Sequence, residues 1–501
     1  MAIRTPKEYV DSLKDDRRIY INGKLYHDVT KHPVLRRALH RGMIDYVMCQ
    51  DPKYKKLMIE KDANGEPYHF AFKPPENAAD LLRRHDIQLI QSRIQAGPSS
   101  GIKFVGIDAL HAVTAASRMI DKQSGVSKYV ERVEAFRNHC KKIDAALAGG
   151  ITAAKGDRKL RPSKQKQHKD FYPRVVDQTK DGIYVTGALA NISHVTYANY
   201  LIVVPCRAMP EEDKDYAVSF AVSPAEKGIT LIHPQTPDIE WGDYFDYPLS
   251  AKLMGSDCVI VFENVFIPWE RVFLCQEWQF ASLMTYQFAN YHRLSGLSKK
   301  VGLSTVQAGV ALLMAEYNGL ENDAIVRDKL SWLIWYAETT AALCRAAAAN
   351  PTTDPVTGWV YPDQMITNCA KFFGSDNYHL ALKMMEDITG GLVSTIPSAK
   401  DYLNPATHDL LEKYLAAKEG VPTEHRMRAI KLVKDLADVY GQGENLHAEG
   451  SLAAQKLTFL TAADIETYKA AAKQACGIEG WEKNEIYGNL MPRPIFEDII
   501  K

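Results

Sequence analysis

The feature that most constrains the fold is the hydrophobic period, which changes twice along the chain. Residues 129–147 carry apolar side chains at steps of three and four, the spacing of one buried helix face. Residues 150–275 instead hold short β-branched runs between turn residues, such as Ile183–Thr186 after Lys-Asp-Gly. The helical period then returns. This order predicts an α+β chain with four parts: a helical N-terminal domain (1–148), a central antiparallel β-barrel (149–276), a C-terminal helical bundle (277–476) and an extended arm (477–501).

The C-terminal part is expected to be a bundle of long helices. The segment 330–349 is rich in Ala, Leu and Trp and has few charges, which is typical of a helix in a bundle or a subunit interface. We therefore expect a homotetramer, a dimer of dimers joined through the C-terminal helices. The stretches with helical period are 279–318, 324–349, 366–388, 407–418, 424–440 and 450–475.

Composition excludes several classes of protein. The chain has 61 basic and 61 acidic side chains, without the basic excess of nucleic-acid or membrane-surface binders. It has no apolar run of about 18 residues and no apolar signal segment at its start, so neither a membrane span nor secretion is expected. Its eight cysteines are scattered and form no Cys-x-x-Cys pair, which indicates reduced thiols, a cytoplasmic location and no structural zinc.

Several short sequence motifs occur one after another along the chain. They include Lys155-Gly-Asp-Arg158, a run from Asp181 to Ala188, Val261-Phe-Glu-Asn-Val-Phe-Ile-Pro268, Tyr291-His-Arg293 and Met385-Glu-Asp-Ile-Thr-Gly-Gly391. Together these motifs resemble those of the 4-hydroxyphenylacetate 3-hydroxylase / 4-hydroxybutyryl-CoA dehydratase superfamily. Their sequences are most similar to the dehydratase branch. The resemblance runs from about residue 5 to residue 475 and implies an acyl-CoA dehydrogenase-like fold.

The resemblance implies FAD as the cofactor. Two cations on a glycine-containing turn suit a pyrophosphate or an anionic flavin ring, and paired glycines allow close backbone approach. The alternatives are a plain surface turn and a plain helix C-cap. No Gly-x-Gly-x-x-Gly follows a strand, so electrons are expected from a separate flavin reductase. The residues expected to hold the flavin are Lys155, Gly156, Asp157, Arg158, Asn191, Ile192, Ser193, Gly390 and Gly391.

The dehydratase branch holds an iron–sulfur cluster with three cysteines and one histidine, and this chain departs from that pattern. By the register of Val105-Gly-Ile-Asp-Ala109, two cysteine positions fall on Ser100 and Phe104, and the third falls on Lys299. Only the histidine, His292, is present. Phenylalanine cannot ligate iron and lysine brings a cation where a thiolate is required. The sequence therefore predicts an iron-free protein with no metal site.

The catalytic candidates implied by the branch are His292, Lys300 and Glu444. A histidine and a glutamate on converging helices can move a proton. The alternatives are a core histidine, a solvated lysine and an exposed helix start. The hydroxylase branch's own phenol-binding positions are Val105, Ala109 and Gly149 here, so a simple phenol hydroxylase is not supported.

Two enzyme classes and one non-catalytic reading remain open. The favoured hypothesis is a reduced-FAD-dependent monooxygenase of a two-component system that acts on a small organic substrate, aromatic or not. The alternative is a redox-neutral FAD-dependent isomerase or lyase that acts on an acyl-CoA-like substrate without an iron–sulfur cluster. The third is a scaffold subunit. The first is preferred because of how the superfamily is populated.

Overall fold

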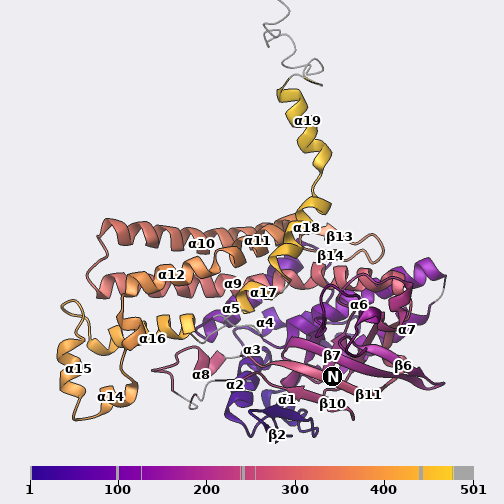
Figure 1. Ribbon diagram of the computed structural model, residues 1–501, viewed down its shortest axis with the longest axis horizontal. Helices are drawn as coiled ribbons and strands as arrows, with labels where there is room; N and C mark the ends of the chain where they lie inside the picture. The colour runs from indigo at the N-terminus through magenta and orange to yellow at the C-terminus, as the bar shows by residue number, and fades with distance from the viewer. Residues whose placement is uncertain are drawn as a thin grey trace, which may run out of the picture.

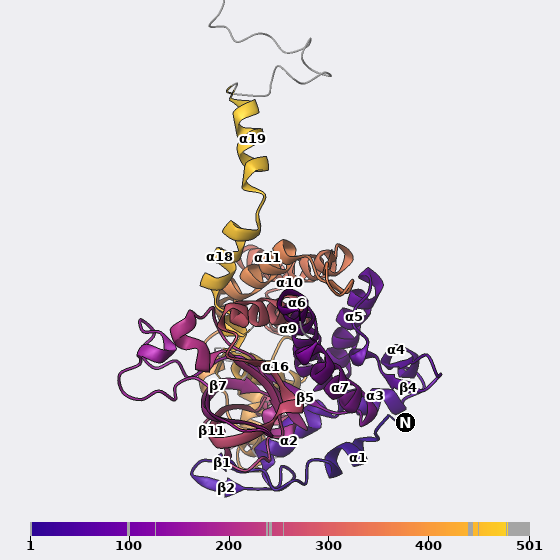
Figure 2. The same ribbon diagram turned by 90° about the vertical axis from the view of Figure 1, so that its right-hand side faces the viewer.

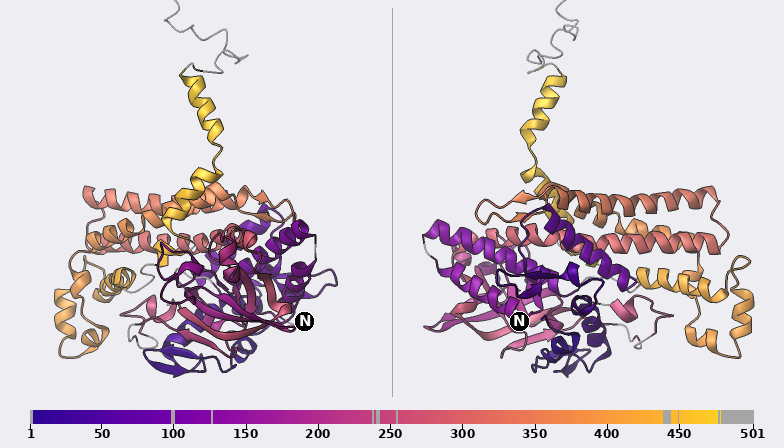
Figure 3. Two further views of the ribbon diagram at one scale, coloured as in Figure 1. Left: turned by 45° about the vertical axis from the view of Figure 1, so that its right-hand side comes forward. Right: turned by 180° about the vertical axis from the view of Figure 1, so that it is seen from behind.

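The computed structural model describes residues 3–97, 101–125, 127–236, 239, 243–253, 255–438, 444–448, 450–476 and 478. Long helices form a bundle along one side of the molecule, and the strands lie beneath one end of that bundle (Figure 1). The same two layers are visible from behind (Figure 3). The general expectation of helices, then strands, then helices is confirmed.

The N-terminal part is mainly helical, as expected. Its longest helices are α5 and α6, and α5 lies beside the bundle (Figure 2). Its helices are α1 (Pro6–Asp11), α2 (Pro33–Gly42), α3 (Ile44–Gln50), α4 (Lys55–Met58), α5 (Ala78–Ile94), α6 (Lys103–Ser124) and α7 (Lys128–Lys142). A small hairpin is formed by β3 (Ile59–Lys61) and β4 (Pro67–His69).

The central strands form two sheets, so the expected closed antiparallel barrel is not found. The six-stranded sheet has the order β2-β1-β10-β11-β7-β6 and the four-stranded sheet has the order β12-β9-β8-β5. The strands are β1 (Ile19–Ile21), β2 (Lys24–Tyr26), β5 (Leu147–Gly150), β6 (Arg174–Gln178), β7 (Gly182–Ser193), β8 (Tyr200–Val203), β9 (Val218–Val222), β10 (Ile229–Ile232), β11 (Asp257–Pro268) and β12 (Val272–Cys275). A helix of four residues, α8 (Ser250–Leu253), lies between two of them.

Two of the strand pairs join segments that lie far apart in the chain. β1 and β2 come from the N-terminal part and extend the six-stranded sheet, with β1 parallel to β10. β5 pairs in parallel with β8 at one edge of the other sheet. The alternation of apolar and polar residues within a strand does not reveal which distant strand it pairs with. These parallel pairs could therefore not be predicted from the sequence pattern. The predicted domain boundary at residue 149 lies within β5, and the domain limits stay a prediction.

The C-terminal bundle follows the predicted helices closely. The predicted 366–388 helix is split in two at Asn377, whose side chain donates to the Phe373 carbonyl at 2.9 Å. The predicted 450–475 helix is also split, at residues 463–464. The helices are α9 (Ala281–Tyr317), α10 (Ala324–Ala349), α11 (Gln364–Asp376), α12 (Tyr378–Thr389), α13 (Leu392–Thr395), α14 (Ala399–Leu403), α15 (His408–Tyr414), α16 (Thr423–Asp438), α17 (Glu444–His447), α18 (Leu452–Ala462) and α19 (Ile465–Ala475). A second small hairpin is formed by β13 (Thr352–Thr353) and β14 (Val360–Tyr361).

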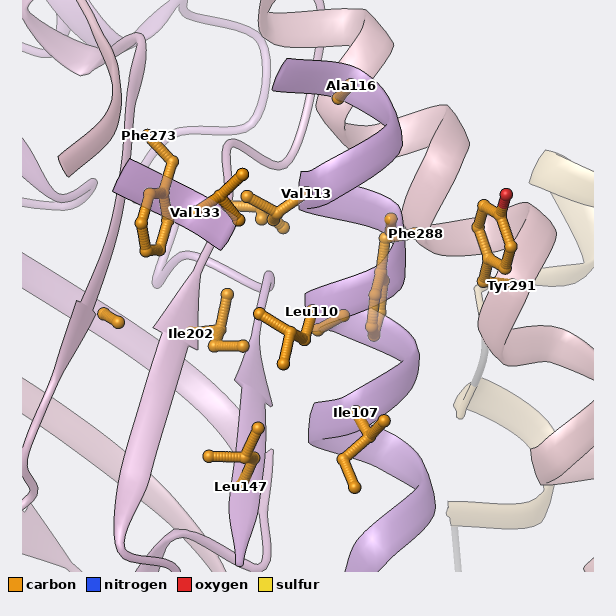
Figure 4. Close-up of a cluster of buried hydrophobic side chains, with 14 of the residues drawn as sticks. Ile107, Leu110, Val113, Ala116, Val133, Leu147, Ile202, Phe273, Phe288 and Tyr291 are labelled. Carbon is orange, nitrogen blue, oxygen red and sulfur yellow. The ribbon is translucent and has the colours of Figure 1, made fainter. Parts of the chain in front are cut away.

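Helix α6 joins the sheet layer to the bundle. One face of it packs Ile107 and Leu110 against Leu147 and Ile202 of the four-stranded sheet (Figure 4). The approach is close because position 106 is glycine, where a Cβ atom would lie 2.2 Å from the Leu147 carbonyl carbon. Another face of α6 therefore remains for contact with α5 and α9.

A buried lysine ties the start of α6 to the chain before β5. Lys103 is fully buried, and its Nζ donates to the Asp144 carboxylate at 2.7 Å and to the Asp144 and Ala145 carbonyls at 2.6 and 2.9 Å. Burial lowers the pKa of Lys103, and burial raises the pKa of nearby Asp45 to about 6. Asp45 accepts from the Lys103 backbone N–H at 2.9 Å. This cluster fixes where α6 begins.

The last described helix, α19, projects away from the rest of the subunit (Figures 1 and 2). Apolar side chains on it and on α18 are exposed, including Leu460 at 70% and Tyr468 at 68%. Of the predicted arm 477–501, only Ile478 belongs to the described residues, so that expectation lies outside them. No described helix is long and apolar enough to span a membrane.

Candidate active site

Three helices bring a carboxylate, a histidine and an arginine into direct contact. Asp108 lies on α6, Arg84 on α5 and His292 on α9. Asp108 is 1% exposed, and its Oδ2 lies 3.1 Å from His292 Nδ1. Arg84 forms an ion pair with the other carboxylate oxygen. A buried carboxylate is stable as an anion only when it is paired in this way.

The serine one turn beyond the histidine completes the carboxylate's partners. Ser295 donates its hydroxyl to Asp108 Oδ2 at 2.6 Å. Residues three apart on a helix share a face, so α9 presents His292 and Ser295 to Asp108 together. The carboxylate thus accepts bonds from two helices and fixes the position of the imidazole.

His292 has one ring nitrogen engaged and one available. Because an ionised Asp108 accepts the Nδ1–H proton, Nε2 carries the lone pair. Nε2 has no hydrogen-bond partner among the residues that the structure describes, and the side chain is 12% exposed. The ring stacks on Phe288 with centroids 5.0 Å apart. This tautomer and exposure suit proton transfer at Nε2.

Arg84 is itself held by the backbone. It donates to the Ala71 carbonyl at 3.1 Å, and His111 lies 3.0 Å from the same oxygen. Burial lowers the pKa of His111, so this histidine is neutral. Phe104 lies under the Arg84 guanidinium at 5.2 Å. One of the positions matched to a cluster cysteine is therefore a buried aromatic ring that packs beside the ion pair.

The other two catalytic candidates lie elsewhere on the bundle. Lys300 donates to Ser375 on α11 at 2.7 Å, and Lys371 donates to the same hydroxyl at 2.6 Å. Lys300 is eight residues beyond His292, about 12 Å along the helix axis. The side chain of Glu444 lies outside the described residues. Its helix, α17, contacts the lysine pair through the Leu446 carbonyl, 3.2 Å from Lys371 Nζ.

Two of the expected flavin segments lie side by side. The backbone before Lys155 runs antiparallel to β7, with Ala154 N donating to Ala188 O at 3.3 Å and Ala190 N donating to Thr152 O at 2.8 Å. Asn191 is therefore about 13 Å from Lys155 along this ladder. Arg158 is exposed, and no described carboxylate lies within 4.0 Å of its guanidinium or of the Lys155 ammonium.

The remaining residues of these segments differ in exposure. Asn191 has a left-handed backbone (φ 56°) and is exposed, whereas Ile192 is buried in the core between the sheets. Ser193 is half-buried and pairs with Asp257 of β11. Gly156, with φ 55°, packs closely on Gln165 and Phe171. Asp157 is exposed and its backbone N–H bonds to Gln165.

The glycine pair lies at the other end of the bundle. Gly390 caps α12, and the preceding Ile388 carbonyl accepts from Asn318 at the C-terminal end of α9. The sheets contact the opposite end of α9, where Thr285 bonds to the Pro205 carbonyl at 2.8 Å. Because α9 has 37 residues, its ends are about 55 Å apart. One subunit does not bring Gly390 and Gly391 to Lys155.

Asp108, Arg84 and Ser295 are the residues that sequence reasoning missed. Asp108 stands in the phrase Val105–Ala109, which served only to set the register. Its 184-residue separation from His292 hides the pairing, although an acidic residue inside an apolar helix is a signal that could have drawn attention. Among the described residues, no group of three His, Cys, Asp or Glu side chains is arranged to hold a metal ion.

Known proteins resemble this chain over nearly its whole length. It is 32% identical to a 4-hydroxybutyryl-CoA dehydratase/vinylacetyl-CoA-Delta-isomerase of Clostridium aminobutyricum, covering 95% of this chain and all of that protein. It is 26% identical to the oxygenase component of 4-hydroxyphenylacetate 3-monooxygenase of Thermus thermophilus, covering 86% and 88%.

Solved structures of related proteins have the same fold as this chain. An oxygen-tolerant archaeal 4-hydroxybutyryl-CoA dehydratase from N. maritimus superposes with a TM-score of 0.88 at 29% identity, covering 96% of both chains. An oxygenase component of 4-hydroxyphenylacetate 3-monooxygenase complexed with FAD shares the fold, with a TM-score of 0.83 at 24% identity over 94% and 98%. Residues 5–274 and 281–477 match the N-terminal and C-terminal families of 4-hydroxyphenylacetate 3-hydroxylase. The chain belongs to the 4-hydroxyphenylacetate 3-hydroxylase family, whose flavin-dependent oxidoreductases and dehydratases share this fold.

Proposed function

We propose that this protein is a redox-neutral, FAD-dependent isomerase or lyase that moves a proton within an acyl-CoA-like substrate. The observation that carries the proposal is the His292–Asp108 pair, with an imidazole Nε2 that is available to substrate. A base fixed in one tautomer by a buried carboxylate is what the shift of a double bond in a β,γ-unsaturated thioester requires. The Clostridium relative's name includes such an isomerase activity.

Each residue of the site has a separate role in the proposed proton transfer. Arg84 keeps Asp108 anionic, and Asp108 holds the Nδ1–H of His292. His292 Nε2 then takes a proton from the carbon next to the thioester carbonyl. After that proton exchanges with solvent, the imidazolium delivers a proton to the far carbon of the allylic system. Phe288 shields one face of the ring from water. A bound flavin, held by Lys155 and Arg158, would supply an electron acceptor. Lys300 and Glu444 remain candidates for orienting the thioester.

FAD fits the groups that this chain presents. Lys155 and Arg158 offer two cations without described carboxylate partners, and Asn191 and Ser193 offer an amide and a hydroxyl on the adjoining strand. Gly390 and Gly391 leave open space where a Cβ atom would stand, which admits a ligand close to the backbone. These are the donors that an anionic dinucleotide needs.

Replacing Arg158 by alanine is expected to weaken flavin binding by about 2 kcal/mol, the scale of a charged hydrogen bond. Ser193→Ala should cost about 1 kcal/mol, because a neutral hydroxyl exchanges readily with water. Titration of the apoprotein with FAD, followed by flavin fluorescence, measures both. His292→Ala is the control and should leave flavin affinity unchanged. Equal affinity in wild type and Arg158→Ala would show that Arg158 is only a surface cation.

The separation of the flavin groups is consistent with an oligomer. The ends of α9 are about 55 Å apart, so we expect a second copy in the homotetramer to bring Gly390 and Gly391 to Lys155. We expect a tetramer of about four times 56.2 kDa by light scattering at micromolar concentration. A monomer would contradict this expectation. Exposed apolar side chains on the bundle's outer helices are available for the contacts: Ile325, Ile334, Trp335, Leu457, Leu460, Ile465 and Tyr468.

The second candidate function is the two-component monooxygenase, which would use reduced FAD from a separate flavin reductase and a small organic substrate. It is favoured by Phe104, a buried ring at a position that the dehydratase branch uses for a cluster thiolate. The Thermus relative carries a monooxygenase name. A cytoplasmic location stays part of both proposals. All eight cysteines are free, and Cys476 is the exposed one.

Anaerobic turnover separates the two candidates. Oxidised, FAD-loaded enzyme is incubated with vinylacetyl-CoA in D₂O without dioxygen or reductant. The isomerase is expected to form crotonyl-CoA with deuterium at the former terminal carbon. A product that forms only with dioxygen and reduced flavin would establish the monooxygenase and contradict our first proposal. Metal analysis of the same sample tests the expected absence of iron.

A further inference from the structure

A short loop after the flavin segment concentrates positive charge. Residues 159–169 contain five lysines and arginines and no carboxylate, in a chain whose formal net charge is zero. We call this segment the cationic loop. Its cations are Lys159, Arg161, Lys164, Lys166 and Lys169. A concentration of one sign of charge raises the local concentration of anionic ligands.

The cationic loop has an ordered scaffold. Buried Gln165 accepts from the Asp157 N–H at 3.0 Å and donates to the Asp157 carbonyl at 2.8 Å. Ser163 N–H donates to the fully buried Asp213 at 2.9 Å. Arg161 lies 3.7 Å from the same carboxylate. The backbone is therefore fixed from inside, and the lysines are held in place rather than spread over a flexible tail.

The four lysines of the loop carry uncompensated charge. Lys159, Lys164, Lys166 and Lys169 are exposed, and none lies within 4.0 Å of a carboxylate in the described part of the chain. Some surface lysines of this protein pair locally, such as Lys7 with Asp11 at 2.7 Å, whereas these four gather on one loop without a described carboxylate partner. The arrangement points to an anion supplied from outside.

An aromatic surface stands among these lysines. The His168 ring stacks on Phe171 with centroids 3.9 Å apart and an interplanar angle of 26°. Asp170 N–H donates to His168 Nδ1 at 3.1 Å, which fixes the orientation of the ring. Its outer face is exposed. An exposed, oriented ring beside several cations presents a stacking surface for a nucleobase and charges for its phosphates.

We propose that the cationic loop binds the adenosine-phosphate end of a coenzyme A thioester. Lys164, Lys166 and Lys169 bind the phosphates, and the adenine stacks on His168. This inference rests on the proposed function, because it names the carrier of that substrate.

The position of the loop supports this assignment. Ala153, just before the flavin segment, lines one small cavity with Pro205 and Cys206. The Pro205 carbonyl bonds to Thr285, two turns before His292 on α9. These contacts join the segment before the loop to the part of α9 that carries His292.

The ADP half of FAD also carries an adenine and phosphates, so it could bind the same loop as coenzyme A. Variants can distinguish these two ligands. Lys155 and Arg158 precede the cationic loop and are assigned to the flavin, whereas the four lysines lie beyond them in the chain. The triple variant K164Q/K166Q/K169Q is therefore expected to keep its affinity for FAD. Loss of FAD affinity with unchanged binding of coenzyme A would assign the loop to the flavin and overturn the proposal.

Calorimetric titration of the FAD-loaded protein with free coenzyme A provides the main test. The triple variant should bind about tenfold more weakly, the sum expected for three surface charge contacts. Wild type should prefer coenzyme A over dephospho-coenzyme A, and the variant should lose this preference. The control K53Q/K55Q/K56Q removes the same charge from three exposed lysines in the helical part and should bind like wild type.

A second variant tests the stacking surface without changing the lysines. His168→Ala should weaken binding of coenzyme A and dephospho-coenzyme A equally, by about tenfold, the usual scale for stacking of one base. Unchanged Kd values in both variants would overturn the proposal. Because binding is measured without turnover, an enzyme that binds coenzyme A but fails the anaerobic isomerase test contradicts only the proposed function.

Discussion

Replacing His292 by alanine is expected to lower kcat by about 10²- to 10⁴-fold, the usual contribution of a positioned general base. FAD affinity and folding should be unchanged, because the ring contacts Asp108 and Phe288 and lies outside the flavin segments. Steady-state isomerisation of vinylacetyl-CoA under anaerobic conditions gives the rate. A variant with wild-type kcat would show that His292 is only a core histidine.

Asp108, the carboxylate that holds His292, should affect kcat nearly as much as His292 itself. Asp108→Asn keeps the shape but can present a donor to Nδ1, which favours the other tautomer and leaves a proton on Nε2. Turnover should fall strongly, and the thermal midpoint should fall as well, because buried Arg84 loses its ion-pair partner. Ser295→Ala is the matched control, since it removes one neutral hydrogen bond from Asp108 and leaves the imidazole in place. Its kcat should fall by less than about tenfold.

Replacing Lys103 by methionine is expected to cost about 3–5 kcal/mol of stability, because it leaves a buried carboxylate without its partner. The Asp144 carboxylate and two carbonyls all accept from Lys103 Nζ, and the side chain is fully buried. Denaturant unfolding with a probe of the N-terminal helices measures the loss.

Two further variants make that result specific. Lys128→Met removes a lysine that is 40% exposed and 3.4 Å from Glu277, so it should cost less than about 1 kcal/mol. The double variant Lys103→Met/Asp144→Leu removes both buried charges and should regain part of the lost stability. If Lys103→Met were as mild as Lys128→Met, the buried pair would not be what holds α6 against β5.

Part of the candidate site could be predicted from the sequence. The phrase around His292 placed the histidine on a long helix, and the structure confirms that helix as α9. The phrase around Val105 contained Asp108, but nothing local connects the two residues. Their contact depends on how α6 and α9 cross, and that crossing depends on the packing of α6 against β5 through Gly106. The flavin residues stay predictions, although two of their segments meet on one strand ladder.

The sequence by itself determined the order of helical and strand segments, because periods of 3.6 and 2 residues are local properties of an amphipathic chain. Helices such as α9 and α10 could therefore be predicted nearly to the residue. Only the tertiary structure decided that the strands form two open sheets, since β1 and β5 find parallel partners far along the chain. It also decided that Asp108 meets His292 and that Gly390 lies far from Lys155 within one subunit. These outcomes depend on the relative orientation of packed elements, which no local pattern contains.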